Sequence, residues 1–251
     1  SNYTEKKKNA LEVMKRAAEF FTENLFNSPD AEFAREYLKK RSITEEVIRK
    51  YGLGYAPKGF DDLQKHLNTD ISFLETAGLV TKRENEKGYT DKFRNRLTIP
   101  VKDENGNVVA FGARALTDKQ NPKYLNSPDT ILYNKSKILY GFDTAKEAIR
   151  DYDSVLICEG YFDAISLQTG GVTNAVASCG TALTQDHIRL IAKYCESRRI
   201  YLAFDTDNAG QMATERSADL IKEAFSGLGD IKQFDSCYAA GGDNYSCEIR
   251  V

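Results

Sequence analysis

The sequence predicts an α/β protein with an α+β subdomain over residues 1–150 and a parallel-sheet subdomain over residues 151–251. Two observations carry this prediction. The first part shows helical periodicity and then strand-like runs, without a regular alternation of the two. From residue 153 onward, short apolar runs alternate with helix-like segments, which is typical of a parallel sheet with helices packed against it.

An amphipathic helix is expected near the start of the chain. Leu11, Met14, Ala18, Phe21 and Leu25 follow one another at intervals of three and four residues, so they share one face of a helix. This face needs a partner surface in the core. Further helices are expected to end near residue 40 and to cover 60–67 and 71–77, with another short one opening at residue 42 or 44.

A β-hairpin is expected in the second half of the first subdomain. Strand-like runs at 97–101 and 108–113 flank Asn105-Gly106, a dipeptide typical of tight turns between antiparallel strands. The segment from 121 to 141 contains two prolines and several turn-forming residues, so we expect a loop there. A helix over 144–150 closes the first subdomain.

The second subdomain alternates strands and helices. Apolar runs that read as strands begin at residues 154, 174 and 199, and each precedes a helix-like stretch. A fourth strand is expected at 230–234. In open sheets of this type, ligand sites form at the carboxyl ends of the strands, so polar residues at those ends are candidates for a functional site.

Two strand ends carry carboxylates. Glu159 directly follows the first apolar run of this subdomain, Gly160 permits a tight turn, and Asp163 falls in the first turn of the next helix. Asp205 ends the third apolar run, and Asp207 lies two residues further along. If the two strands are near neighbours, the carboxylates converge, because adjacent strands lie about 5 Å apart. Such oxygen ligands suit Mg²⁺ or Mn²⁺, the metals of phosphoryl and nucleotidyl transfer.

Composition limits the alternatives. The 35 basic and 37 acidic residues give a net charge of −2, which by itself gives no reason to expect a nucleic-acid partner. The five cysteines form no C-x-x-C pair, so we expect a reduced, cytoplasmic compartment and no zinc site. No apolar run is long enough for a membrane span and no signal peptide is visible, so no membrane partner is expected.

Several motifs resemble those of one protein family. The stretches "EGYFD", "ASCGTALT" and "FDTDNAG" are similar to the Toprim domain of bacterial DnaG-type DNA primases. Upstream, "DKFRNRLTIPVKDENGNVVAFGAR" and "NPKYLNSPDTILYNKSKILYGFDTAKEAI" resemble the basic N-terminal part of the primase RNA-polymerase core. The resemblance covers about residues 10–235 and implies a Toprim-like fold for the second subdomain.

The resemblance also implies roles for the acidic residues. Glu159 matches the central catalytic acid, which acts as a metal ligand or as a general base. Asp205 and Asp207 match catalytic metal ligands, and Asp163 matches a helper at the same metal site. The family's third acidic element, usually an Asp-Pro-Asp, is reduced here to Gly242-Asp243, so Asp243 is the expected ligand from that segment.

Basic and polar residues of the first subdomain match positions that contact the template strand and the nucleotide in the family. Arginine and lysine hold phosphates, and a tyrosine ring can stack on an unpaired base, so the chemistry agrees with these assignments. The matched residues are Arg94, Arg96, Arg114, Lys123, Tyr124, Asn126 and Lys135.

The function implied is that of a DNA primase catalytic core, a nucleotidyltransferase that makes short RNA primers on single-stranded DNA from ribonucleoside triphosphates with Mg²⁺ or Mn²⁺. A monomer is expected. The family's N-terminal zinc ribbon and its C-terminal region that binds the replicative helicase have no counterpart in this sequence, so a domain-sized piece with poor unaided priming is expected. Two alternatives remain: a Toprim nuclease or topoisomerase-like enzyme, and a non-catalytic single-stranded DNA-binding module of a mobile element.

Overall fold

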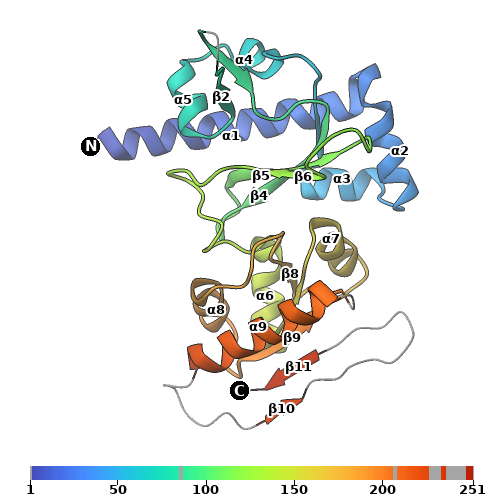
Figure 1. Cartoon of the computed structure of the whole chain (residues 1–251), viewed down its shortest axis with the longest axis vertical. Helices are drawn as coiled ribbons and strands as arrows, with labels where there is room; N and C mark the ends of the chain where they lie inside the picture. Colours follow the sequence, from blue (N-terminus) through green and yellow to red (C-terminus); the bar gives the residue numbers. More distant parts are fainter. Residues whose placement is uncertain (1, 85–86, 206–207, 226–232, 236–246, 251) are drawn as a thin grey trace. The chain divides into compact units, whose positions relative to one another are not determined.

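The computed structural model describes residues 2–84, 87–205, 208–225, 233–235 and 247–250. The chain forms two compact units, Ser1–Asn134 and Lys135–Val251. The division falls before the boundary expected at residue 150, because helix α6 (Phe142–Tyr152) contributes its buried side chains to the core of the second unit. Figure 1 labels most of the helices and strands of both units.

The first unit combines helices with a four-stranded antiparallel sheet in the order β1-β4-β5-β6 and a separate pair, β2 and β3. Its elements in chain order are α1 (Asn2–Asn27), the 3-10 helix η1 (Pro29–Ala31), α2 (Glu32–Lys40), α3 (Glu45–Tyr51), β1 (Gly54–Ala56), α4 (Asp62–Leu67), α5 (Ile71–Thr76), β2 (Val80–Lys82), β3 (Tyr89–Asp91), β4 (Arg96–Lys102), β5 (Val108–Ala115) and β6 (Tyr124–Asn126).

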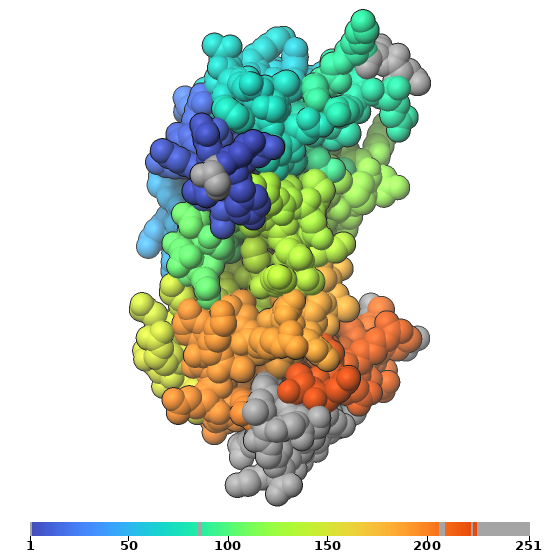
Figure 2. Space-filling model, turned by 90° about the vertical axis from the view of Figure 1, so that its left-hand side faces the viewer, coloured from blue at the N-terminus to red at the C-terminus, as the bar shows by residue number. Residues whose placement is uncertain are grey.

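Helix α1 supplies one wall of the core of this unit. Met14, Phe21 and Leu25 are buried, as the periodicity predicted, whereas Leu11 and Ala18 are only partly buried. The buried face therefore lies about one residue earlier than the predicted stripe. Its side chains join those of α4, α5 and β5 in one apolar cluster. Figure 2 shows the first turns of α1 in blue beside the cyan segment that carries α4 and α5.

The predicted hairpin is confirmed as β4 and β5. Its turn has Gly106 in the left-handed region at φ 84°, and Oδ1 of Asp103 accepts hydrogen bonds from the backbone N–H groups of Asn105 and Asn107, both at 2.9 Å. Strand β6 lies inside the segment predicted to be a loop, so that part of the prediction was wrong. A strand of three residues is too short to show an alternating pattern.

The second unit contains a five-stranded sheet in the order β10-β11-β9-β7-β8. Strands β9, β7 and β8 are parallel, as predicted, while β10 and β11 pair antiparallel at one edge. After α6, its elements are β7 (Ser154–Cys158), α7 (Tyr161–Thr169), β8 (Ala175–Ala177), α8 (Gln185–Ala192), β9 (Arg199–Ala203), α9 (Asn208–Phe225), β10 (Gln233–Asp235) and β11 (Cys247–Arg250).

Apolar side chains from the three parallel strands form the core of the second unit with helices α6, α8 and α9. Val155 and Ile157 alternate with a less buried Leu156, so one face of β7 is packed more tightly than the other. This core fixes the carboxyl ends of β7 and β9 beside each other. Among the helices of the described residues, none is long and apolar enough to cross a membrane.

Candidate functional site

The carboxyl end of β7 presents Glu159. Gly160, with φ −113° and ψ 161°, forms the N-cap of α7, and its N–H donates to Oδ2 of Asp163 at 3.1 Å. The carbonyl of Glu159 accepts from the N–H of Cys179, in the loop after β8, at 2.8 Å. Hydrogen bonds thus connect the turn that carries Glu159 to the first turn of α7 on one side and to the loop after β8 on the other. Asp163 lies in the first turn, as predicted, where its charge suits the helix dipole.

The strand ends that carry Glu159 and Asp205 are neighbours. Strands β7 and β9 are paired in parallel with Cys158 opposite Ala203, which satisfies the condition for convergence. The backbone N–H of Asp205 donates to Oε1 of Glu159 at 3.3 Å. The carboxylate of Glu159 therefore reaches the adjacent strand end, and the side chain of Asp205 is exposed there.

Gly210 allows helix α9 to begin close to Asp205. A Cβ atom at position 210 would overlap the backbone carbonyl oxygen of Asp205, so any side chain there would push the helix away from the strand end. The glycine of "DNAG" is therefore required by the close approach of two backbone segments.

The donors at this edge of the sheet fit a divalent cation. Glu159 and Asp205 supply carboxylate oxygens, and Mg²⁺ in phosphoryl-transfer sites is held by one or two carboxylates together with water and substrate phosphates. The thiol of Cys158 is no competing ligand, since burial raises its pKa to about 12 and its Sγ donates to the carbonyl of Val176. In the part of the chain that the structure describes, no group of three or more His, Cys, Asp and Glu side chains could hold a metal ion. The predicted ligands Asp207 and Asp243 lie outside that part.

A stack of two arginines and two tyrosines lies in the first unit. The Cζ of Arg41 is 5.0 Å from the ring centroid of Tyr37, and the Cζ of Arg114 is 5.1 Å from the same ring. Arg114 also lies 5.4 Å from the ring of Tyr124, which is its partner across β5 and β6. We call these four residues the arginine–tyrosine stack. Cation–π contacts of this kind are worth about 0.5–1 kcal/mol each at exposed sites.

The guanidinium group of Arg114 is partly buried in this stack. Nη1 of Arg114 donates to the carbonyl of Ala115 at 2.6 Å, and among the described residues its buried Nε has no hydrogen-bond partner. Burial raises the pKa of Tyr124 to about 12, and the phenol of Tyr37 acts in the same direction. Tyr124 therefore stays protonated, and its ring is held against Arg114.

Arg96 differs from the other predicted contact residues, because it is buried. Its Nη1 donates to the carbonyls of Ala113 at 3.3 Å and Pro122 at 2.8 Å. Burial, followed by the charge of Arg114, lowers its pKa. Arg96 thus connects β4 and β5 to the segment that leads into Lys123, and it supports the surface from below.

The other predicted contact residues are distributed over both units. Lys123 and Asn126 are exposed on either side of Tyr124. Arg94 lies over the ring of Phe60, with its Cζ 4.3 Å from the centroid. Lys135 is exposed at the start of the second unit. The structure thus brings Arg114, Lys123, Tyr124 and Asn126 together in one unit.

Sequence reasoning missed Tyr37 and Arg41. They are four residues apart, on and just after α2, so they share one helix face. That spacing was a visible signal, but nothing local indicates that the face lies against β5 and β6. His187 was interpreted as an ordinary helix residue, whereas it is buried and makes specific hydrogen bonds.

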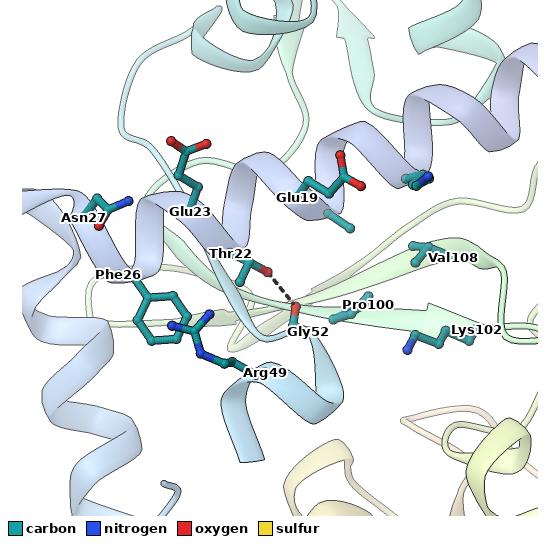
Figure 3. A pocket seen from close by; sticks show the side chains of 12 residues that line it. Glu19, Thr22, Glu23, Phe26, Asn27, Arg49, Gly52, Pro100, Lys102 and Val108 are labelled. Atoms are coloured by element: carbon teal, nitrogen blue, oxygen red, sulfur yellow. Dashed lines mark hydrogen bonds between the residues drawn. The ribbon is translucent and has the colours of Figure 1, made fainter. Parts of the chain in front are cut away.

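A groove of about 640 Å³ lies elsewhere on the first unit, between α1, the end of α3 and the β4–β5 hairpin. Figure 3 shows Arg49 against the ring of Phe26, at 4.3 Å, and the hydroxyl of Thr22 donating to the carbonyl of Gly52. None of the residues predicted to be functional lines this groove.

Comparisons with known families agree with both units. Residues 20–146 match the model described as "DNA primase catalytic core, N-terminal domain", and residues 156–231 match the model described as "Toprim-like". The Toprim match implies dependence on a divalent metal.

Relatives and solved structures cover most of this chain. A DNA primase of Synechococcus elongatus is 44% identical over 217 residues, which are 84% of this chain and 31% of that protein. The RNA polymerase domain of Mycobacterium tuberculosis primase DnaG matches with a TM-score of 0.79 and 37% identity, covering 84% of this chain and 71% of that one. A DnaG primase catalytic domain bound to ssDNA matches with a TM-score of 0.77 and 32% identity, covering 86% and 69%.

The chain spans about a third of the length of the curated primases that it matches. Within that span, the mixed α/β fold, the neighbouring acidic strand ends and both family matches agree. The chain belongs to the family of DnaG-type DNA primase catalytic cores, with a Toprim domain as its second part.

Proposed function

We propose that this chain synthesises short RNA primers on single-stranded DNA by nucleotidyl transfer from ribonucleoside triphosphates. The observation that carries the proposal is the hydrogen bond of the Asp205 backbone to Glu159, which places two carboxylates at adjacent strand ends of a Toprim domain. A structure of a related catalytic domain bound to ssDNA supports the choice of template.

Glu159 and Asp205 would hold Mg²⁺ or Mn²⁺, with Asp207, Asp163 and Asp243 as further ligands or helpers. The cation supplies charge neutralisation for the triphosphate and the leaving pyrophosphate. Glu159 accepts the N–H of Asp205, so its carboxylate is oriented toward the second strand end before substrate arrives. From this position Glu159 would act as a metal ligand or as a general base.

The arginine–tyrosine stack would bind the DNA template. Guanidinium groups pair with phosphates, and the stacked rings limit the rotamers of both arginines, so less conformational entropy is lost on binding. Lys123 and Asn126 extend this surface, and Arg94 adds a further cation. Arg96 acts indirectly by holding the segment before Lys123.

The partners of the longer protein follow from the family. We propose that the whole protein adds a zinc-binding module and a region that binds the replicative helicase, and that it works in the cytoplasm. The isolated chain is proposed to be a monomer.

The test is divalent-dependent extension of a short RNA annealed to single-stranded DNA, which removes the need for unaided initiation. Glu159→Gln and Asp205→Asn should each lower the rate by about a hundredfold or more, whereas Asp151→Asn, at an exposed position of the second unit, should extend normally. Full extension by both site variants would refute the proposal. Nicked DNA in place of extended RNA would identify a Toprim nuclease instead.

A further inference from the structure

A strap, residues 135–141, is held against the second unit at both ends. Its first residue is Lys135, which is exposed, and its last is Gly141, which has φ 78°. Backbone carbonyls near both ends of the strap accept hydrogen bonds from three side chains. These are Gln168 of α7, His187 of α8 and Thr184 at the N-cap of α8. The mechanism described above uses none of those side chains.

The first end is held by His187 and Thr184. Nε2 of His187 lies 2.9 Å from the carbonyl oxygen of Lys135, and Nδ1 accepts from the backbone N–H of Thr184 at 3.2 Å. Because a carbonyl only accepts and an N–H only donates, the ring must be neutral with its proton on Nε2. The hydroxyl of Thr184 donates to the carbonyl of Ser136 at 2.5 Å. Burial lowers the pKa of His187, which agrees with this neutral form.

The second end is held by Gln168. Its Nε2 donates to the carbonyls of Gly141 at 3.1 Å and Ala175 at 2.7 Å, while its Oε1 accepts from the hydroxyl of Thr144 at 3.0 Å. A Cβ at position 141 would come within 2.8 Å of this amide nitrogen and would displace it, and the φ of 78° at this position also favours glycine.

Between these ends the strap forms a bridge to the edge of the sheet. Tyr140 and Ala177 exchange two backbone hydrogen bonds at 2.9 and 3.0 Å. The ring of Tyr140 packs edge-on against Tyr161, with centroids 4.9 Å apart, and Tyr161 is the first residue of α7, two positions after Glu159. The strap is therefore fixed to strand β8 and to the first turn of α7, which begins two positions after Glu159.

His187 is fully buried and Gln168 is nearly so. A buried polar side chain is stabilising only when it is hydrogen-bonded. Apolar side chains of similar volume would fill the same space without needing hydrogen-bond partners. The hydrogen bonds of these polar side chains hold the backbone of the strap in one position. We expect this to fix the position of Lys135, the exposed first residue of the strap.

We propose that His187 and Gln168 are positioning residues that fix the strap so that the ammonium group of Lys135 meets a phosphate of the template or of the incoming nucleotide. The inference rests on the proposed function and on the resemblance by which Lys135 matches a position that contacts the template strand or the nucleotide. It adds that this contact depends on two buried side chains that touch no substrate.

A double-mutant cycle tests the proposal. Binding of a labelled single-stranded oligonucleotide and, separately, of a ribonucleoside triphosphate is measured for Lys135→Ala, His187→Leu and the combined variant at several salt concentrations. Lys135→Ala should weaken binding of the contacted ligand about tenfold and reduce the salt slope by about one. His187→Leu should weaken binding of the same ligand several-fold and should reduce the salt slope by the same amount. In the combined variant, the loss should be no greater than for Lys135→Ala alone.

His187→Gln, which keeps an amide donor for the carbonyl of Lys135, should restore binding in part. Gln168→Leu should behave like His187→Leu in the same cycle, so the proposal stays testable if one variant fails to fold. Lys193→Ala removes an exposed charge at the end of α8 and should bind normally. Binding of either the oligonucleotide or the ribonucleoside triphosphate should weaken, and the ligand affected identifies the source of the phosphate that Lys135 contacts.

Losses that multiply in the combined variant would overturn the inference, because they would show that His187 acts independently of Lys135. Unchanged binding by Lys135→Ala would overturn it too. In both cases intact primer extension by the wild-type chain would leave the proposed function standing. A wild-type chain that binds neither ligand and extends no primer would refute the function and the inference together.

Discussion

In the second unit the acidic side chains are placed by the backbone, whereas in the first unit the basic side chains are placed by aromatic rings. Glu159 and Asp205 lie at the ends of paired parallel strands and are connected by a backbone N–H. Arg41 and Arg114 come from a helix and a strand far apart in sequence and meet across the ring of Tyr37. An acidic site built in this way is rigid and local, while the basic surface depends on the packing of three elements.

This difference predicts how each region fails. The acidic site should be most sensitive to changes that move the backbone, even where no functional side chain is touched. The basic surface should be most sensitive to loss of a planar cation or of a ring, and it should tolerate small backbone changes.

Gly210→Ala should have the largest effect. In an ordinary helix this change stabilises by about 1 kcal/mol, but here the new Cβ would overlap the carbonyl oxygen of Asp205. We expect the free energy of unfolding of the second unit to fall by about 3 kcal/mol in urea denaturation. Ala209→Ser, at the exposed neighbouring position, is the control. A stabilised Gly210→Ala protein would show that the backbone does not constrain this strand end.

Arg114→Leu should weaken binding of single-stranded DNA about tenfold, or about 1.4 kcal/mol, because it removes a cation that lies between two rings. Arg114→Lys should recover only part of this loss, since a lysine lacks the planar fork. Fluorescence anisotropy at fixed salt measures both. Equal binding by the lysine variant and the wild type would show that residue 114 contributes only its positive charge to DNA binding.

Arg96→Leu provides the matched comparison within the same unit. Arg96 is buried and hydrogen-bonded to two carbonyls. Its loss should therefore lower the free energy of unfolding more than it lowers the affinity of the folded protein for single-stranded DNA. Thermal unfolding and anisotropy on the same samples separate the two effects. A normal melting temperature together with a tenfold loss of affinity would place Arg96 among the direct contacts.

The smallest effect concerns pH. Burial lowers the pKa of His187 in the folded chain, while the hydrogen bonds to the carbonyls of Lys135 and Ile138 and the charge of Asp186 act against this shift. The unfolded chain, with an imidazole pKa of about 6.5, binds the proton first as the pH falls. The stability contributed by neutral His187 is therefore complete above about pH 6.5 and is lost below it, by at most about 1.4 kcal/mol per pH unit.

His187→Gln should remove this contribution, so the free energies of unfolding of wild type and variant from urea denaturation should differ by a constant amount above about pH 6.5 and approach each other below it. Parallel curves across the whole window would contradict the neutral, buried state of the ring. Such a result would also weaken the link between His187 and the strap.

Much of the acidic site could be predicted from the sequence, because its signals are local. Glu159 and Asp205 follow apolar runs, and the topology of a parallel sheet brings such ends to one edge. The hairpin around Gly106 and the helix that contains Met14 and Phe21 were likewise readable from turn chemistry and periodicity.

The rest depends on contacts between distant segments. Nothing in the segment around Tyr37 and Arg41 indicates that it faces Arg114, and nothing near Arg96 indicates that it is buried beneath Lys123. The short strand β6 and the antiparallel direction of β11 could not be predicted for the same reason, because their pairing partners and not local patterns define them. His187 looked ordinary because its hydrogen-bond partner is fifty-two residues away.

The central claim is that the neighbouring ends of β7 and β9 hold a divalent cation. Crystals of the chain soaked with Mn²⁺ test it most directly by anomalous diffraction. We predict an anomalous peak within coordination distance, about 2.2 Å, of carboxylate oxygens of both Glu159 and Asp205. Ordered density for both side chains without any peak between them, in crystals that bind Mn²⁺ elsewhere, would contradict the claim.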